Sequence, residues 1–452
     1  MALLLIATFN TLQLYITGAL VPSTLTISTF SNKTIINSRI APIISNKKIQ
    51  QKFEQAYHSF IEEENYEEAL KHAEILCLLN PQSAEFHHKV AYAYLKQLKW
   101  EKAIEAEMKT PELDSTYIPA LDLLAHAYGA LDNWEKTGFY GHQALALKDK
   151  AIPDLEHEII PIPAPKNGKR IISFSLFGNN SKYIEPAVLN TQLAPVLFPG
   201  WTCRFYVDDS VSAEAIQRFR NNGAEVIKVG APLDNWPGTM WRFLAINDPE
   251  VEYVIFRDAD SIICYRDAAA VSEWIKSGTL FHTIRDSGSH TVLILAGMWG
   301  AKTGAVPDMQ ERIQNFVDEG YPSRHFADQD FLEKELWAYI RQNLFAHDRL
   351  FDFCNAHKIP GEFYSNYQIA FSEGVTSFNA TTDCEDGSLA KWTLYSSASP
   401  LVNPDYSLNV VPEFKVCSYV TEVKNGAVSA FLPKRYGNAI KAKLARINIE
   451  QI

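Results

Sequence analysis

Apolar and polar residues are arranged in two different ways along the chain, and the change falls near residue 150. Between residues 50 and 148, apolar positions recur with helical spacing, and the segment matches itself after a shift of 34 residues. From about Arg170 onward, short runs of β-branched and aromatic residues take turns with amphipathic stretches of helical period. The pattern therefore predicts an array of helices followed by an α/β domain.

An aromatic residue marks the 34-residue repeat at one fixed position. Tyr66, Trp100 and Trp134 coincide when the chain is shifted by 34 residues, and small residues such as Ala69 and Ala103 recur at a second position. Small residues at fixed helical positions allow neighbouring helices to approach closely. A 34-residue period with an aromatic residue between two helices resembles tetratricopeptide repeats.

The tetratricopeptide resemblance implies three helix pairs over residues 49–150. The third pair departs from the pattern at Thr137 and Gly138, which indicates a repeat that caps the end of the array. Two roles for the array are open. Its concave surface could bind a protein partner, or the array could only pack on the second domain or on another copy.

Composition sets the other domain boundaries. Residues 1–48 have no charge before Lys33 and match neither a signal peptide nor a membrane span, so we expect a leader of low order, with a membrane anchor as the alternative. Residues 151–168 contain four prolines and predict an extended linker. The α/β domain follows over residues 169–355, and residues 356–452 are expected to complete it.

The α/β domain is expected to contain a mostly parallel sheet that helices cover on both faces, because its strands and helices alternate. In such sheets, ligands bind at the carboxyl ends of the strands. The predicted strands are 170–178, 203–209, 224–229, 252–257 and 279–284, and the predicted helices are 183–197, 211–221, 238–247 and 267–276.

Two carboxylates follow the most apolar of these strands. Asp258 and Asp260 come directly after VEYVIFR, where a buried strand ends. Acidic side chains are costly at such a position unless something positive joins them. An Asp-x-Asp pair alone says little, and the chain has a second one at Asp328 and Asp330. The strand before Asp258 favours a cation carrying a nucleotide diphosphate, and a solvated turn is the alternative.

Overall composition narrows the classes of function. A net charge of −11 argues against a general nucleic-acid binder, which needs a basic face. The six cysteines are scattered without a CxxC pair, which favours a reducing, cytoplasmic compartment over a disulfide framework or a zinc site. Peripheral association with a membrane stays open. The chain lacks GxGxxG and a P-loop, which argues against a dehydrogenase or an ATPase.

Longer motifs within residues 168–355 resemble a group of bacterial and viral glycosyltransferases with the GT-A fold, a Rossmann-like α/β fold. The motifs are RDADS, a helix ending in Trp, HTIRDSGSH and GMWG within residues 256–302. The segments SLFGNN, WTCRFYVDD, MWRFLAINDP, DQDFL and AHD resemble the rest of the group's pattern. The resemblance implies a hexosyltransferase-like enzyme of polysaccharide biosynthesis. It would move a sugar from a nucleotide donor to a glycan, a lipid-linked or a protein acceptor.

The resemblance also implies roles for individual residues. Asp258, Asp260 and His347 would hold Mn²⁺ or Mg²⁺, since hard cations prefer carboxylate oxygens. Asp328 and Asp330 would bind the acceptor or act as general base, and capping of the next helix is the alternative. The residues expected to contact the donor are Phe177, Gly178, Asn179, Asp208, Asp209, Arg257, Asp258, Arg285, Gly297 and Trp299. We also expect Asp286 and His290 to form a polar cluster with Arg285.

Two hypotheses follow for the whole chain. The first is a metal-dependent glycosyltransferase whose repeats bind the acceptor or a partner. The second is a repeat-based interaction protein whose α/β domain is catalytically inactive. Free nucleotide released from a sugar donor distinguishes them.

Overall fold

The computed structural model describes residues 47–452 except for 156–157, 232, 361–373 and 403–407, together with two hairpins nearer the N-terminus. The chain divides into two compact units, residues 1–120 and residues 121–452. Most of the predicted leader lies outside the described residues. The hairpins are formed by β1 (Leu3–Thr8) with β2 (Thr11–Ile16) and by β3 (Thr29–Phe30) with β4 (Lys33–Thr34).

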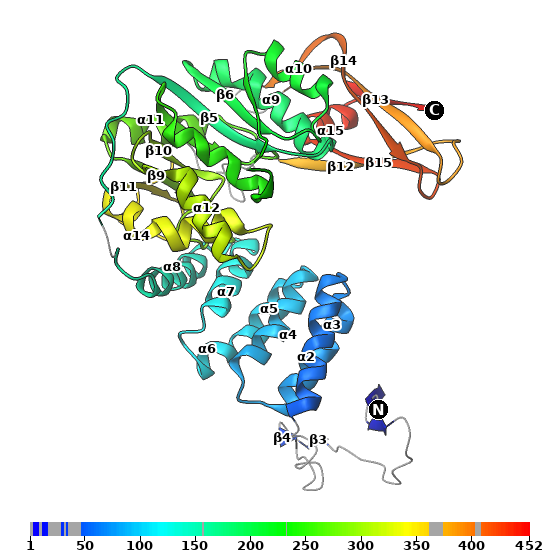
Figure 1. Cartoon of the computed structure of the whole chain (residues 1–452). Helices are drawn as coiled ribbons and strands as arrows, with labels where there is room; N and C mark the ends of the chain where they lie inside the picture. Colours follow the sequence, from blue (N-terminus) through cyan, green and yellow to red (C-terminus); the bar gives the residue numbers. More distant parts are fainter. Residues whose placement is uncertain are drawn as a thin grey trace. The chain divides into compact units, whose positions relative to one another are not determined.

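The first unit is an array of helices whose turns repeat every 34 residues (Figure 1). Tyr66 and Trp100 each begin the second helix of a pair, and Glu64 and Leu98, two residues earlier, both have φ of 57°. Ala69 is fully buried between helices. These features confirm the predicted tetratricopeptide-like repeats. The helices are α2 (Lys47–Glu62), α3 (Tyr66–Leu79), α4 (Ala84–Lys96), α5 (Trp100–Glu107) and α6 (Lys109–Leu113).

The third helix pair, α7 (Ile118–Ala130) and α8 (Trp134–Ala151), belongs almost wholly to the second unit. A β-carbon at Gly138 of α8 would lie 2.6 Å from the carbonyl oxygen of Leu350 in the α/β domain. The glycine that was expected to mark an end cap thus permits close packing on that domain. The second compact unit begins at Leu121, thirty residues before the linker predicted at residues 151–168.

The proline-rich segment also packs on the α/β domain. The side chain of Ile159 is buried in its core, and the N–H of Ile162 donates to the carbonyl oxygen of Gly304 at 2.8 Å. The expectation of an extended spacer between domains is therefore wrong for the described part of residues 151–168.

Seven strands form the central sheet in the order β11-β9-β10-β8-β5-β6-β7. Strand β10 runs antiparallel to both of its neighbours, and all other adjacent pairs are parallel, so the sheet is mostly parallel as predicted. The strands are β5 (Lys169–Leu176), β6 (Trp201–Val207), β7 (Glu225–Lys228), β8 (Val251–Arg257), β9 (Phe281–Arg285), β10 (Met298–Lys302) and β11 (Leu344–Asp348).

Alternating residues of each strand face two separate cores. One face, which includes Phe174, packs on α9 (Ser181–Leu197), α10 (Ala213–Asn221) and α11 (Tyr265–Ser277). The other face includes Phe256. Its cover is formed by η2 (Gly238–Asn247), α12 (Met309–Glu319), α13 (Ala327–Phe331), the π-helical turn η3 (Leu332–Leu336) and α14 (Trp337–Ile340), and the short turns η1 (Leu233–Asn235) and η4 (Arg341–Asn343) lie nearby in the chain.

The helix predicted at residues 238–247 is present as a 3₁₀-helix. The backbone N–H of Arg242 donates to the hydroxyl of Ser175 on β5 at 2.9 Å. The N–H of Arg242 therefore binds a side chain of the neighbouring strand β5.

The C-terminal strands share the core of the second unit (Figure 1). Glu185 of α9 accepts two hydrogen bonds from Arg218 of α10, both at 2.7 Å, and one from the hydroxyl of Tyr419 at 2.6 Å. The C-terminal elements are β12 (Val375–Thr381), β13 (Leu389–Val402), β14 (Leu408–Glu422), β15 (Ala427–Pro433), α15 (Lys434–Lys441) and β16 (Ala445–Gln451).

We expect Glu185→Gln to lower the free energy of unfolding of the second unit by about 3 kcal/mol, because it leaves the mostly buried guanidinium of Arg218 without its carboxylate. Denaturant unfolding of the full chain measures the change. The control is Glu214→Gln, which alters an exposed glutamate on α10. Equal unfolding midpoints for the two variants would contradict the role given to Glu185.

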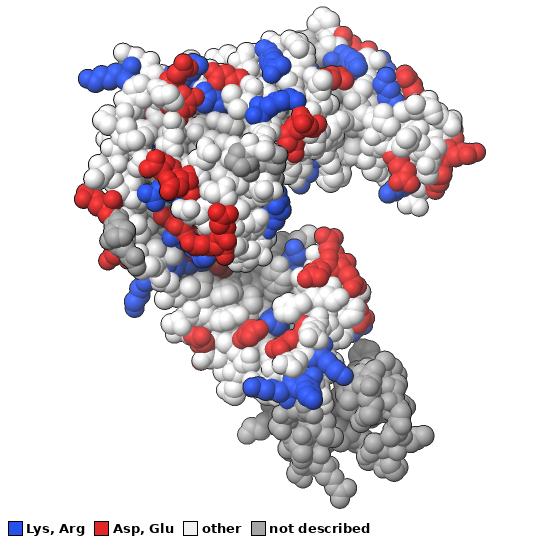
Figure 2. Space-filling view, viewed as in Figure 1, with Lys and Arg blue, Asp and Glu red and all other residues white. Residues whose placement is uncertain are grey.

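On the face drawn in Figure 2, the described residues of each unit include both signs of charge and form no continuous basic surface. Within the described part of the chain, no helix combines the length and apolarity needed to cross a membrane.

Candidate functional site

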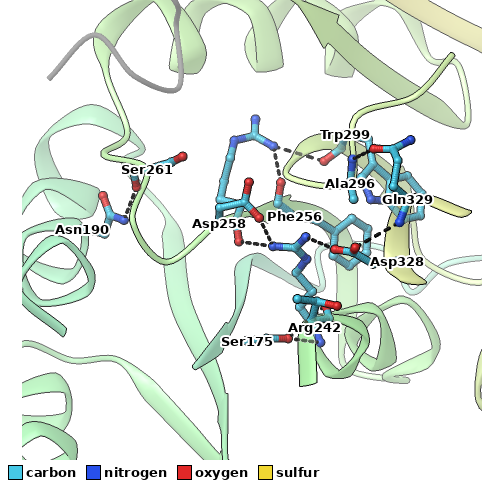
Figure 3. Close-up of polar contacts among 12 residues, drawn as sticks. Ser175, Asn190, Arg242, Phe256, Asp258, Ser261, Ala296, Trp299, Asp328 and Gln329 are labelled. Atoms are coloured by element: carbon cyan, nitrogen blue, oxygen red, sulfur yellow. Dashed lines mark hydrogen bonds and ion pairs between the residues drawn. The ribbon is translucent and has the colours of Figure 1, made fainter. Parts of the chain in front are cut away.

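The acid pair lies where β8 ends, at the edge of the sheet that also holds the carboxyl ends of β5 and β6. The side chain of Asp258 is 45% exposed, and Oδ2 of Asp260 lies 4.0 Å from Nζ of Lys182 at the start of α9. Asn190 of α9 donates to the carbonyl oxygen of Ser261 at 2.8 Å, which fixes the loop after the pair (Figure 3). Helix α9 thus lies close to Asp260 and fixes the loop that follows the pair.

Arg242 joins the two predicted acid motifs. One of its guanidinium nitrogens, Nη1, lies 2.5 Å from Oδ1 of Asp258, and the other, Nη2, lies 2.7 Å from Oδ2 of Asp328 (Figure 3). Arg242 is 2% exposed, so this cation balances both carboxylates from beneath. The sequence predicted a metal ion as the positive partner of the acids, and Arg242 was not among the predicted site residues.

Two serines of β5 fix the backbone of Arg242. The hydroxyl of Ser173 donates to its carbonyl oxygen at 2.7 Å, and the hydroxyl of Ser175 accepts from its N–H at 2.9 Å. Strand β5 thus holds both the carbonyl oxygen and the N–H of Arg242. Because the backbone is fixed, the guanidinium group extends from a fixed position. The position of Asp258 is therefore determined by the core of the domain.

Burial dominates the electrostatics of the site. It raises the pKa of Asp260, and the neighbouring charge of Asp258 raises it further. Burial also raises the pKa of Asp328, although Arg242 opposes that shift. Burial lowers the pKa of Arg242, but the two carboxylates outweigh it, so the net pKa is raised and the guanidinium stays charged. The positive charge of Arg242 thus stabilises the ionised forms of the neighbouring aspartates Asp258 and Asp328.

Gly297 lies against Asp258, as expected for a glycine at the site. A β-carbon at this position would collide with the Asp258 carboxylate. Gln329 holds the loop before the glycine, because its side-chain oxygen accepts from the N–H of Ala296 at 3.1 Å and its amide nitrogen donates to the carbonyl oxygen of Ile294. Gly297 is therefore next to the acid pair, and its contact with a donor stays a prediction.

Asp328 and Asp330 do not act as a pair. Oδ1 of Asp328 accepts from the N–H of Gln329 at 3.0 Å and its Oδ2 is bound to Arg242, so both oxygens are engaged. Burial raises the pKa of Asp330, and the nearby charge of Lys334 opposes that shift. Of the two, Asp328 is the one that shares the guanidinium of Arg242 with Asp258. Neither aspartate is the N-cap of α13, which is Phe326.

Two loops at the ends of β5 and β6 meet beside the acid pair. Gly178 has φ of 75°, and its N–H donates to the hydroxyl of Ser210 at 2.6 Å. The N–H of Ser210 in turn donates to Asp208 at 3.0 Å. Phe177 and Asn179 are exposed on the first loop. Four of the predicted donor-binding residues are thus brought together.

Asp209 is the fifth residue predicted on these loops, and it is directed into solvent. Its side chain is almost fully exposed, and its carboxylate pairs with Nζ of Lys228 at 2.6 Å. Asp209 is therefore less suited to donor binding than Asp208.

Two predicted donor contacts are wrong because both side chains are buried inside the domain. Arg257 faces α11, where its guanidinium binds both oxygens of Asp267 at 3.0 and 2.6 Å. Trp299 is fully buried and stacks on Phe256 with ring centroids 4.3 Å apart. Arg257 and Trp299 therefore stabilise the core instead of contacting a ligand.

Arg285 is also wrong as a donor contact. It is fully buried, donates to the carbonyl oxygen of Val292 at 2.9 Å and lies over the ring of Phe353. The polar cluster expected nearby is present in part, since Asp286 pairs with His290 at 2.8 Å. Arg285 itself shapes the loop that follows β9.

His347 does not join the acid pair, and its assignment as a metal ligand is wrong. Its ring faces α11, where Nε2 lies 3.0 Å from Glu273, and Nδ1 lies 2.8 Å from Nε2 of His282. Asp258 is on the other face of the sheet, next to η2. Among the described residues, no group of three or more His, Cys, Asp or Glu is arranged to hold a metal ion.

The two carboxylates still fit one mode of metal binding. Mg²⁺ in nucleotide enzymes commonly takes one or two carboxylates and completes its shell with phosphate oxygens and water. Asp258 and Asp260 are adjacent and partly exposed, and Oδ1 of Asp258 is shared with Arg242. The residues present therefore suit a cation that arrives with a diphosphate better than a cation held by protein alone.

The histidine pair predicts a pH-dependent stability. Burial lowers the pKa of His282 well below 6.5 and lowers that of His347 as well. The unfolded chain therefore binds protons at a higher pH than the folded protein. The stability from the two neutral histidines is complete above about pH 6.5 and is lost as the pH falls below it.

We accordingly expect the melting temperature to fall between pH 7 and pH 5 and the fall to be smaller in His282→Phe, whose ring can still stack on Trp274. Thermal unfolding of both proteins across this range measures the difference in slope. The buried carboxylates titrate in both proteins and cancel in the comparison. Identical slopes would show that His282 does not titrate on unfolding.

No family model matches this chain, and no curated protein matches it. The solved structures similar to parts of it include the TPR2B domain of yeast Sti1 in complex with pHsp70, with 17% identity, a TM-score of 0.22, and coverage of 23% of this chain and 82% of that one. The Arabidopsis OM64 TPR domain has 16% identity and a TM-score of 0.22, and covers 22% and 84%. The Sgt2 TPR domain from Aspergillus fumigatus has 15% identity and a TM-score of 0.23, and covers 25% and 74%.

The repeats and the sheet together define the class of this protein. It has an N-terminal array of tetratricopeptide-like repeats and an α/β unit with a mixed, mostly parallel sheet.

Proposed function

We propose that this protein is a metal-dependent glycosyltransferase that uses a nucleotide-diphosphate sugar. The observation that carries the proposal is the placement of Asp258 and Asp260 at the carboxyl end of a buried strand, beside two loops from neighbouring parallel strands. Ligands of open α/β sheets bind at this edge. The long ordered motifs of residues 256–302 support the same class of enzyme.

Asp258 and Asp260 would hold Mn²⁺ or Mg²⁺, which would neutralise the diphosphate and favour departure of the nucleotide. Lys182, close to Asp260 at the start of α9, supplies a second positive charge for a phosphate oxygen. Gly178, Asn179 and Asp208 form the loops on which the nucleoside would rest.

Arg242 and Asp328 are buried below the acid pair and position Asp258. Asp328 is almost fully buried and both of its oxygens are bound, so it anchors Arg242 and is not free to take a proton from the acceptor. This replaces the role of general base that its motif suggested. The anchored Arg242 keeps one oxygen of Asp258 fixed while the other stays available to a cation.

We propose that the repeats bind a protein partner or an acceptor, which would be a glycan, a lipid-linked sugar or a protein. The proposal rests on the helix pairs, since stacked repeats of this kind form extended binding surfaces. A role in polysaccharide biosynthesis is part of the same proposal.

Equilibrium binding of nucleoside diphosphates tests the proposed function. We expect isothermal titration to show that one nucleoside diphosphate binds in the presence of Mn²⁺, that it binds far more weakly with EDTA, and that binding is lost in Asp258→Asn. No binding to any of UDP, GDP, ADP, CDP or dTDP with Mn²⁺ present would instead favour an interaction protein with an inactive α/β domain.

A further inference from the structure

The loop between β9 and β10, residues 286–297, leads directly to the candidate site. Its last residue, Gly297, lies against the carboxylate of Asp258. Arg285 and Gln329 hold the second half of the loop, through the carbonyl oxygens of Val292 and Ile294 among others. A displacement of this loop would therefore reach Asp258.

The first half of the loop rests on the third helix pair. A β-carbon at Gly288 would lie 2.9 Å from the carbonyl oxygen of Ala125 and 3.2 Å from the α-carbon of Gly129, both on α7. The backbones of α7 and the loop thus approach closely, and the absence of a side chain at Gly288 permits it.

Lys148 connects both helices of the pair to the loop. Its ammonium group donates to the carbonyl oxygen of Thr291 at 2.5 Å and to the two carboxylate oxygens of Asp122 at 2.8 and 3.0 Å. The side chain of Lys148 is only 14% exposed. A lysine ammonium group has three N–H donors, and in Lys148 they face three acceptors on α7 and the loop. The position of the ammonium group is therefore fixed. Charged hydrogen bonds of this kind are among the stronger ones.

We propose that Lys148 is a positioning residue for the donor site, because it fixes the β9–β10 loop and through it the backbone that contacts Asp258. The inference rests on the proposed function for its catalytic consequence. Its structural consequence, a loop held by the repeat-derived helices α7 and α8, is independent of any reaction. The third helix pair is thus part of the catalytic unit as well as the end of the repeat array.

Hydrogen–deuterium exchange of the full chain tests the positioning directly. In Lys148→Met we expect amides of residues 286–297 to exchange about tenfold faster or more, since one charged hydrogen bond to the loop is lost. The control is Lys150→Met, which removes an exposed lysine two residues later on the same helix and should leave the loop unchanged. Lys148→Arg, which keeps the charge, should restore most of the protection.

A second variant approaches the contact from the loop. Gly288→Ala places a β-carbon against α7 and should also speed exchange in residues 286–297, so the inference stays testable if Lys148→Met folds poorly. Unchanged exchange of the loop in both variants would overturn the inference.

Turnover distinguishes this inference from the proposed function. If the wild-type protein releases nucleotide from a donor, Lys148→Met should lower kcat about tenfold, with Lys150→Met unaffected. A wild-type protein that releases none would refute the proposed function, while the exchange data would still decide whether Lys148 positions the loop. Faster loop exchange with full kcat in Lys148→Met would overturn the link to the site.

Discussion

Replacing Arg242 with methionine is expected to lower the free energy of unfolding of the second unit by about 3–5 kcal/mol and to abolish donor turnover. Methionine occupies a similar volume but carries no charge. It leaves Asp328 buried without a positive partner and frees Asp258 from its fixed orientation. The hydroxyl of Ser173 still donates to the backbone of residue 242 and the hydroxyl of Ser175 still accepts from it, so the effect reports the guanidinium itself.

Denaturant unfolding and nucleotide release measure the two effects of Arg242→Met. The matched control is Arg220→Met, which alters an exposed arginine on α10 and should change neither. Arg242→Lys should recover part of the stability and little of the activity, because one ammonium group cannot reproduce a planar bridge between two carboxylates. Wild-type stability and turnover in Arg242→Met would refute the role given to this residue.

Asp258→Asn should lower nucleotide release by at least about a hundredfold while leaving the fold intact. The amide keeps the size of the carboxylate but loses the charge that a cation requires. Arg242 stays paired with Asp328, so we expect the free energy of unfolding to change by only about 1 kcal/mol.

The control for this substitution is Asp383→Asn, at an exposed position of the C-terminal region. Metal titrations of Asp258→Asn should also require a higher Mn²⁺ concentration for any remaining activity. A variant with wild-type turnover at all metal concentrations would place the reaction elsewhere.

Local patterns predicted the elements of this fold well. The 34-residue period located the helix pairs, and each of the three aromatic residues begins the second helix of its pair. The strand before Asp258 was recognised from its apolar composition. These features depend on residues near one another in sequence, so the sequence contains them directly.

The side of the sheet that each site residue faces was harder to predict. Arg257 lies next to Asp258 in sequence but faces α11, because successive residues of a strand point to opposite faces. His347 is on a strand separated from β8 by two others, and its ring also faces α11. Motif order along the chain does not specify either orientation.

The sequence of β5 contains an indication of the contact with Arg242. Ser173 and Ser175 occupy alternate positions in the apolar part of β5, which indicates a polar partner on one face of this strand. That partner is the backbone of Arg242, sixty-seven residues or more away in sequence. The two serines indicate that a polar partner exists, but a local pattern does not identify a partner so distant in sequence.

Nucleotide release from a panel of nucleotide sugars by the full chain, with and without Mn²⁺, is the most direct test of the proposed glycosyltransferase activity. We expect one sugar donor to be hydrolysed or transferred in a metal-dependent manner, and we expect Asp258→Asn to remove this activity. No release from any donor, by a protein that is folded and supplied with metal and candidate acceptors, would contradict the assignment as a glycosyltransferase.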